Sequence, residues 1–164
     1  MSDLAASASR RPRDGLFYLV AFICGAVTGV IGAALHLVVD DLLHWPQWLV
    51  QRLGDGWTTV AVGAGISAAA ISLAWALVRW LAPEAAGSGV QEVEGALDNL
   101  RPMRWRRVLP VKFLGGLLSL GGGLVLGREG PTIQMGGNLG KMVSDLFKLS
   151  AVDVHTLIAA GAGA

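Results

Sequence analysis

A run of 24 residues without Asp, Glu, Lys or Arg, residues 16–39, limits the folds that this chain can adopt. A helix needs about 20 predominantly apolar residues to cross the hydrocarbon core of a bilayer. A cleavable signal peptide has an apolar region of only about 7–15 residues. The run is therefore too long for a signal peptide, although arginines precede it. The run therefore predicts a retained transmembrane helix.

A second run without these charged residues, residues 57–78, predicts another transmembrane helix. The composition agrees, because only 15% of the residues are charged, against about 25% in soluble domains. Residues 40–55 between the two runs are expected to form a loop, with Trp45 and Trp48 in the interfacial region of the membrane. We therefore expect an all-α, polytopic membrane protein.

The distribution of basic residues predicts how the chain is oriented. The N-terminal segment, residues 1–14, has three arginines, the loop at 40–55 has one, and residues 79–112 have six Lys or Arg. Cytoplasmic loops carry an excess of these residues. The N-terminal segment is therefore expected in the cytoplasm, followed by a transmembrane domain at residues 15–164.

Residues 84–107 are amphipathic and too charged to cross a membrane. Gly87-Ser88-Gly89 is typical of a helix start, and residues 90–99 are expected to form a short helix. Ser88 has two candidate roles. It is either an ordinary N-cap, which is the better interpretation of this tripeptide in isolation, or a hydroxyl that binds an anion beside free backbone N–H groups.

An uncharged stretch farther along the chain is interrupted by two charges. The 15 residues 113–127 lack Asp, Glu, Lys and Arg, and Arg128-Glu129 follows them. Pro131 suits the first turn of a helix, because an N–H group at that position would have no partner in the helix. We therefore expect one helix to end near Gly127 and another to begin near Gly130.

Such a break in a membrane is the mark of an ion pathway. Broken helices are tolerated at membrane depth only where they line a cavity or are buried in protein, and ionisable residues there mark ion or proton paths. The free N–H groups of the new helix favour an anion, and the Glu129 carboxylate can fill that place until a mobile anion or a proton displaces it. The residues alone leave open an alternative, an Arg128–Glu129 ion pair in a surface loop.

Other classes of function lack the residues that they need. Met142 follows Gly140-Lys141 where a P-loop requires Ser or Thr, and the net charge of +1 gives no nucleic-acid footprint. The three histidines have no ligand partner at metal-site spacing, and the single cysteine, Cys24, is expected to be a buried, inert thiol. A membrane hydrolase based on Glu129 would need a paired carboxylate or a nucleophile with its base. We expect no enzyme, no metal and no cofactor.

Three ordered stretches resemble the CLC family of chloride channels and proton-coupled chloride antiporters, and most of all its bacterial antiporters. They are Gly87-Ser88-Gly89-Val90-Gln91-Glu92-Val93-Glu94-Gly95, Arg107-Val108-Leu109-Pro110-Val111-Lys112-Phe113, and Gly127-Arg128-Glu129-Gly130-Pro131-Thr132, which continues to Gly140. The resemblance implies a fold of two inverted repeats, a homodimer in a bacterial inner membrane, and chloride as the transported ligand.

The resemblance also implies roles for individual residues. Ser88 would coordinate the central chloride through its hydroxyl, and Glu129 would be the glutamate that gates the pathway and accepts protons. The backbone N–H groups of Arg128, Glu129 and Gly130 would line the outer anion site. Lys112 and Glu94 match charged positions near the pathway in this family.

The chain departs from the family pattern in two respects. Gln91 stands where the motif around Ser88 usually has proline. A Gly-x-Phe-x-Pro turn, a late tyrosine and an internal proton-transfer glutamate have no counterpart, so we expect most of a first repeat, as a truncated chain, a fragment or half of a split protein. The sequence leaves open a channel, an antiporter, or a membrane scaffold or inactive fragment that transports nothing.

Overall fold

The computed structural model describes residues 14–164, so the predicted N-terminal segment lies outside the described residues except for its last position. The described part is helical and contains no strand. In chain order its elements are α1 (Asp14–Leu42), α2 (Trp45–Leu53), α3 (Trp57–Leu81), the short 3-10 helix η2 (Pro83–Ala85), α4 (Val90–Leu97), α5 (Trp105–Gly121), α6 (Glu129–Leu146) and α7 (Ala151–Gly163). The prediction of an all-α chain is confirmed.

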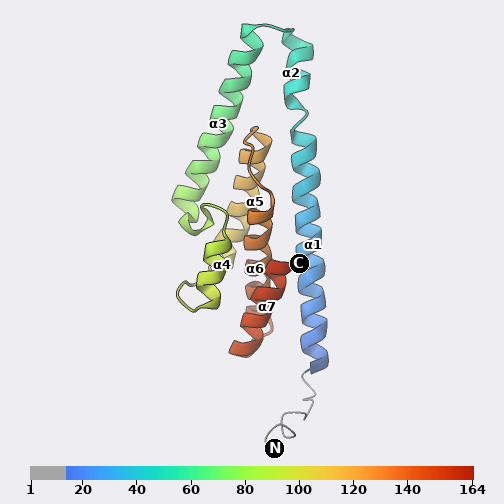
Figure 1. Cartoon of the computed structure of the whole chain (residues 1–164), viewed down its shortest axis with the longest axis vertical. Coiled ribbons are helices and arrows are strands. Elements are labelled where there is room, and N and C mark those ends of the chain that lie inside the picture. The colour runs from blue at the N-terminus through green and yellow to red at the C-terminus, as the bar shows by residue number, and fades with distance from the viewer. Residues whose placement is uncertain (1–13) are drawn as a thin grey trace, which may run out of the picture.

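Two long helices form the frame of the molecule (Figure 1). The stretches Phe17–Leu53 and Trp57–Leu81 are long and apolar enough to cross a membrane. Most of α3 is exposed, including the large side chains of Trp75 and Trp80. In Figure 1, α5, α6 and α7 lie between α3 and α1, and α5 contacts both of these helices.

The expected loop at residues 40–55 is wrong in its middle, where helix α2 forms. Pro46 lies in the first turn of α2. Proline favours a helix at this position because a backbone N–H group there would have no partner within the helix. The Trp45 indole nitrogen donates a hydrogen bond of 2.8 Å to the Gly121 carbonyl oxygen. Helix α2 is thus tied to the end of α5, a contact that spans 76 positions of the sequence.

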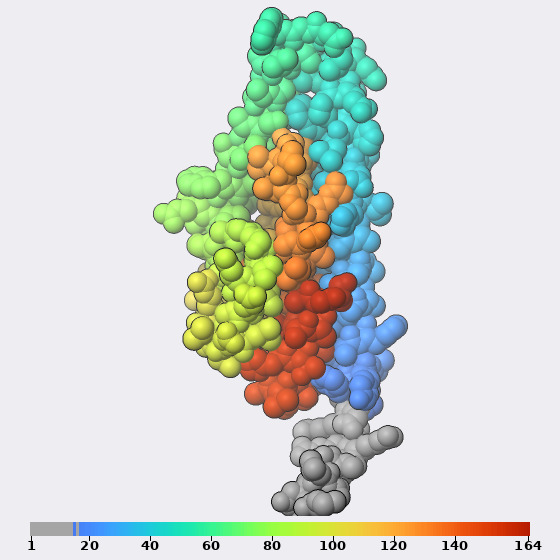
Figure 2. Space-filling model, in the orientation of Figure 1, coloured from blue at the N-terminus to red at the C-terminus, as the bar shows by residue number. Residues whose placement is uncertain are grey.

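Helices α6 and α7 are so close that their backbones contact each other directly at glycines. A Cβ atom added to Gly140 would lie 2.6 Å from the Leu157 carbonyl carbon, and one on Gly161 would lie 3.0 Å from the Gly136 carbonyl carbon. Cys24 packs near this crossing with 1% of its surface exposed, so its predicted burial is confirmed. Figure 2 shows α7 in red on the same face of the molecule as α4 in yellow-green.

The start of α7 gives a test of local stability. Ser150 is the N-cap, and its hydroxyl accepts a hydrogen bond from the Asp153 backbone N–H at 3.4 Å. We expect Ser150→Ala to lower the free energy of unfolding by about 1 kcal/mol, measured by denaturant titration in detergent. Thr156→Ala is the control, because the Thr156 hydroxyl bonds within the helix to the Val152 carbonyl. An equal loss in both variants would contradict the capping role.

Candidate functional site

The predicted break between two helices is present, but the first helix ends earlier than expected. Helix α5 stops at Gly121 rather than near Gly127, and the chain continues without helix to Arg128. Three consecutive glycines explain the early stop, because Gly123 adopts a φ of 94° that other residues rarely reach. Helix α6 begins at Glu129, one residue before the predicted start.

The start of α6 packs directly on the turn that precedes α4. A Cβ atom added to Gly130 would lie 2.8 Å from the Ser88 carbonyl oxygen and 3.0 Å from the Ser88 Cα. Neither helix start has a side-chain cap. The structure therefore brings Ser88, Glu129 and Gly130 together, with two uncapped helix N-termini at the same place.

Ser88 is not the N-cap of α4. The helix begins at Val90, and Gly89 is the N-cap in a left-handed conformation, with a φ of 86°. A Cβ atom on Gly89 would also lie 2.4 Å from the Gln134 Cβ on α6. The Ser88 hydroxyl makes no capping bond and lies at the edge of the site, exposed.

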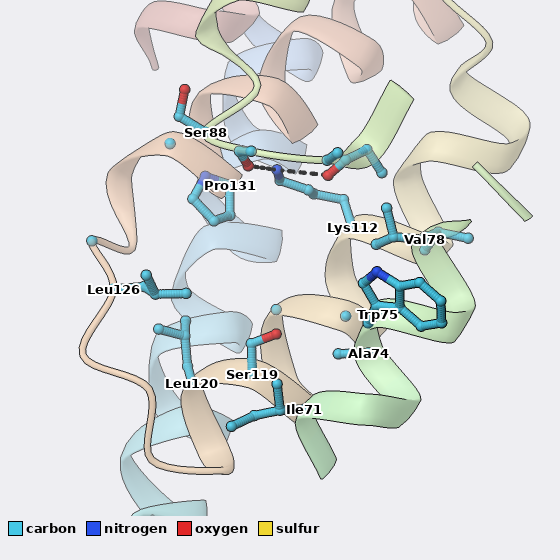
Figure 3. Close-up of a pocket in the computed structure, with 18 of the residues that line it drawn as sticks. Ile71, Ala74, Trp75, Val78, Ser88, Lys112, Ser119, Leu120, Leu126 and Pro131 are labelled. Carbon is cyan, nitrogen blue, oxygen red and sulfur yellow. Dashed lines mark hydrogen bonds between the residues drawn. The ribbon is translucent and has the colours of Figure 1, made fainter. Parts of the chain in front are cut away.

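Two side chains from other helices hold this turn. The Lys112 ammonium on α5 donates hydrogen bonds to the Ala85 carbonyl at 3.1 Å and the Gly87 carbonyl at 2.6 Å, as Figure 3 shows. The Gln134 amide on α6 donates to the Glu84 carbonyl at 2.7 Å. Lys112 is 5% exposed and Gln134 is 1% exposed. Three carbonyl oxygens just before Ser88 are thus fixed by α5 and α6.

These elements enclose a cavity of about 600 Å³ (Figure 3). Its walls come from α3, α5, the turn before α4 and the start of α6. Most of the lining is apolar, as at Ile71, Trp75 and Val78. The polar side chains in the lining are those of Ser88, Lys112, Ser119 and Glu129. The cavity therefore combines one buried ammonium, one carboxylate and two hydroxyls with two helix N-termini.

The Arg128 side chain turns away from this cavity. Its guanidinium lies 2.7 Å from an Asp40 carboxylate oxygen and 3.1 Å from the His36 Nδ1, both on α1. Within residues 14–164, Glu129 is in no ion pair. The alternative of an Arg128–Glu129 pair is therefore wrong. Only the backbone of Arg128, at the N-cap of α6, remains next to the site.

The sequence assigned no firm role to Lys112, and none to Gln134, which belongs to the third of the stretches that resemble the family. One signal was present for Lys112, since it is the only charge between residues 108 and 127. Gln134 had no such signal, because its partner lies 50 positions away. Glu94, which the resemblance placed near the pathway, is not among the residues that line the cavity.

Known proteins with similar sequences show the family to which this chain is related. The family model described as voltage gated chloride channel matches residues 68–164. The chain is 49% identical over 152 residues to the H(+)/Cl(-) exchange transporter ClcA of Citrobacter koseri, a match that covers 89% of this chain and 31% of that protein. The transporter of the same name in Salmonella arizonae is 47% identical over 152 residues, with the same coverage.

A solved structure shows the same fold. The crystal structure of a slow cyanobacterial Cl-/H+ antiporter superimposes with a TM-score of 0.88 at 41% identity, covering 94% of this chain and 36% of that chain. The chain thus spans about a third of the length of the relatives that it matches.

Proposed function

Because this chain belongs to the family of voltage-gated chloride channels, we propose that it forms part of a chloride-transport pathway across a membrane. In this proposal Ser88 and the backbone N–H groups of Arg128, Glu129 and Gly130 bind chloride. The observation that carries the proposal is that Ser88 and Glu129 line one cavity with the buried ammonium of Lys112.

The electrostatics of the cavity favour an anion. An ammonium that is 5% exposed is screened little by solvent. Two helix N-termini add partial positive charge and unpaired N–H donors. The apolar walls lower the local dielectric constant and strengthen these interactions. Chloride, which needs donors and positive charge but no directed covalent chemistry, fits this arrangement.

Glu129 is proposed as the gate and the proton acceptor. Its carboxylate carries the only negative side-chain charge in the cavity lining, and it is exposed there without a cationic side chain as partner in the described structure. A chloride ion and this carboxylate would compete for the same N–H donors. Protonation removes the charge of the carboxylate and with it the competition, which links chloride movement to protons.

Exchange of chloride for protons is favoured over a channel, because the curated relatives are named H(+)/Cl(-) exchange transporters. We further propose a homodimer in a bacterial inner membrane, with lipid around the apolar faces and the N-terminus in the cytoplasm. The positive-inside distribution supports this orientation, since Arg101–Arg107 lie in the same half of the molecule as the start of α1 (Figure 1).

Chloride binding by the purified chain tests the proposal and does not require a complete pathway. We expect Glu129→Gln to bind chloride about tenfold more tightly, because a competing carboxylate is removed, which corresponds to about 1.4 kcal/mol. Ser88→Ala should bind about tenfold more weakly, because a hydrogen bond to a charged group is lost. Titration calorimetry measures both, and Asp98→Asn, on the exposed end of α4, is the control.

A liposome experiment then separates transport from binding. Efflux of chloride that needs the protein and loses its acid dependence in Glu129→Gln would support transport. Unchanged chloride affinity in both cavity variants, together with no efflux at any protein density, would favour a scaffold or an inactive fragment instead.

A further inference from the structure

A second cleft, which shares no lining residue with the Ser88–Glu129 cavity, lies where α5 begins. It encloses about 400 Å³ and is lined by Met103, Arg104, Trp105, Arg106, Arg107 and Asp145. Its lining thus has three guanidinium groups and one carboxylate. Arg106 and Arg107 are exposed, so both groups are accessible to a ligand.

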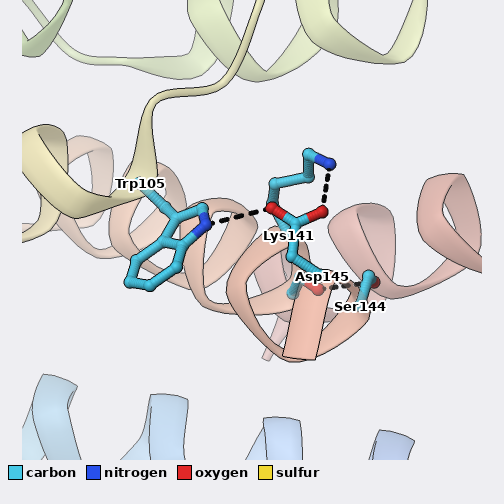
Figure 4. A network of polar contacts seen from close by, with 5 residues as sticks. Trp105, Lys141, Ser144 and Asp145 are labelled. Atoms are coloured by element: carbon cyan, nitrogen blue, oxygen red, sulfur yellow. Dashed lines mark hydrogen bonds and ion pairs between the residues drawn. The ribbon is translucent and has the colours of Figure 1, made fainter. Parts of the chain in front are cut away.

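The carboxylate in this cleft is already engaged on both oxygens. The Asp145 Oδ1 lies 2.5 Å from the Lys141 ammonium, and its Oδ2 accepts a hydrogen bond of 3.0 Å from the Trp105 indole, as Figure 4 shows. Arg104 lies 3.6 Å from a Glu84 carboxylate oxygen. Arg106 and Arg107 have no acidic partner among residues 14–164. Within this part of the chain, two positive charges in the cleft are therefore uncompensated.

The geometry of Arg106 leaves its donors free. Its guanidinium carbon lies over the Trp105 ring, 5.1 Å from the ring centroid, which is within the range of a cation–π contact. The N–H donors of a guanidinium lie in its plane, where they match two oxygens of a phosphate. A cation–π contact uses the charge of the guanidinium and none of its N–H donors, so these donors remain available to an anion.

The residues around the cleft have the composition of a membrane–water interface. The Trp105–Asp145 hydrogen bond places the start of α5 beside the end of α6, so Arg106 and Arg107 of α5 lie at the same end as Lys141 and Asp145 of α6. Beyond it, residues 108–121 of α5 contain only one charge, Lys112. An arginine cluster with a tryptophan next to an apolar helix is typical of the membrane–water interface.

We propose that this cleft binds the phosphate of an anionic phospholipid, with Arg106 and Arg107 as the main donors. A lipid is the ligand that the location supplies, and the uncompensated charge selects an anionic headgroup over a zwitterionic one. Basic residues near an anionic membrane surface each contribute about five- to sixfold to binding, so the two arginines together contribute about 30-fold. The site does not depend on chloride transport.

Native mass spectrometry of the chain released from nanodiscs tests this site. The probes are phosphatidylglycerol and phosphatidylcholine, and the variant is Arg106→Gln with Arg107→Gln. We expect bound phosphatidylglycerol on the wild type, a loss of about 30-fold in the double variant, and no retained phosphatidylcholine. The lysine variants of both positions keep the charge but lack the planar pair of donors, so they should bind more weakly than the wild type and more tightly than the glutamine variants. Binding that falls in this order would show that the loss follows the side-chain chemistry rather than misfolding.

Arg52 offers a matched control at the opposite end of the molecule. Its guanidinium carbon lies 5.4 Å from the Trp48 ring centroid, the same kind of cation–π contact as that of Arg106 with Trp105. Arg52→Gln should leave phosphatidylglycerol binding unchanged. Equal loss in Arg52→Gln, undiminished binding in the double variant, equal retention of phosphatidylcholine, or displacement of the lipid by inorganic phosphate alone would each overturn the proposal.

Discussion

Replacing Lys112 with methionine is expected to lower the free energy of unfolding by about 3 kcal/mol. The ammonium makes two hydrogen bonds to backbone carbonyls, and a hydrogen bond to a charged group contributes about 1.5–3 kcal/mol. Relief of the desolvation of the buried charge offsets part of this loss. Methionine fills a similar volume, so the change in the free energy of unfolding measures the loss of the ammonium group and not the creation of a cavity.

The consequence of this substitution should reach the Ser88 turn. Without the ammonium, the carbonyls of Ala85 and Gly87 lose the group that holds them against α5. Chloride affinity should therefore fall together with stability, because both a positive charge and the position of Ser88 are lost. Denaturant titration followed by far-UV circular dichroism measures the first effect, and titration calorimetry measures the second.

Lys141→Met is the matched control for Lys112→Met. Lys141 pairs with Asp145 one turn along α6 and is partly exposed, and such pairs contribute less than about 1 kcal/mol. The chloride affinity of the Lys141→Met chain should match that of the wild type, since Lys141 lies outside the cavity. A Lys112→Met chain as stable as the control chain would show that the ammonium does not hold the turn.

The parts of the fold that the sequence predicted depend on local signals. The uncharged runs placed α1 and α3, and the proline at position 131 placed the start of α6 within one residue. Each of these signals lies within a few residues of the element that it determines. The same holds for the turn before α4, although the cap moved from Ser88 to Gly89.

The parts that the sequence did not predict depend on contacts between distant residues. The end of α5, which a local glycine run terminates, is also tied to α2 by a hydrogen bond from Trp45, 76 positions away. Arg128 pairs with Asp40 on α1 rather than with its neighbour Glu129. Lys112 and Gln134 reach carbonyls 25 to 50 positions away. No local pattern encodes these partners, so the packing around the cavity had to come from the structure.

Gly89→Ala is expected to destabilise the chain by about 4 kcal/mol and to separate the two helix starts. A φ of 86° costs an alanine about 1–2 kcal/mol. The new Cβ would also lie 2.4 Å from the Gln134 Cβ, and overpacking of this kind costs about 1–3 kcal/mol. Relief of the clash would push α4 from α6, and chloride affinity should fall with the distance between Ser88 and Gly130.

Gly87→Ala separates the two causes of this effect. Gly87 has a φ of 69° but nothing within 4 Å of an added Cβ, so its substitution carries the backbone strain of about 1–2 kcal/mol alone. The difference between the two variants, about 2 kcal/mol, measures the contact of Gly89 with α6. Equal destabilisation of the two variants would mean that moving α4 away from α6 costs no measurable free energy. The contact between the two helix starts would then be too soft to fix the distance between Ser88 and Glu129 on which the proposed chloride site depends.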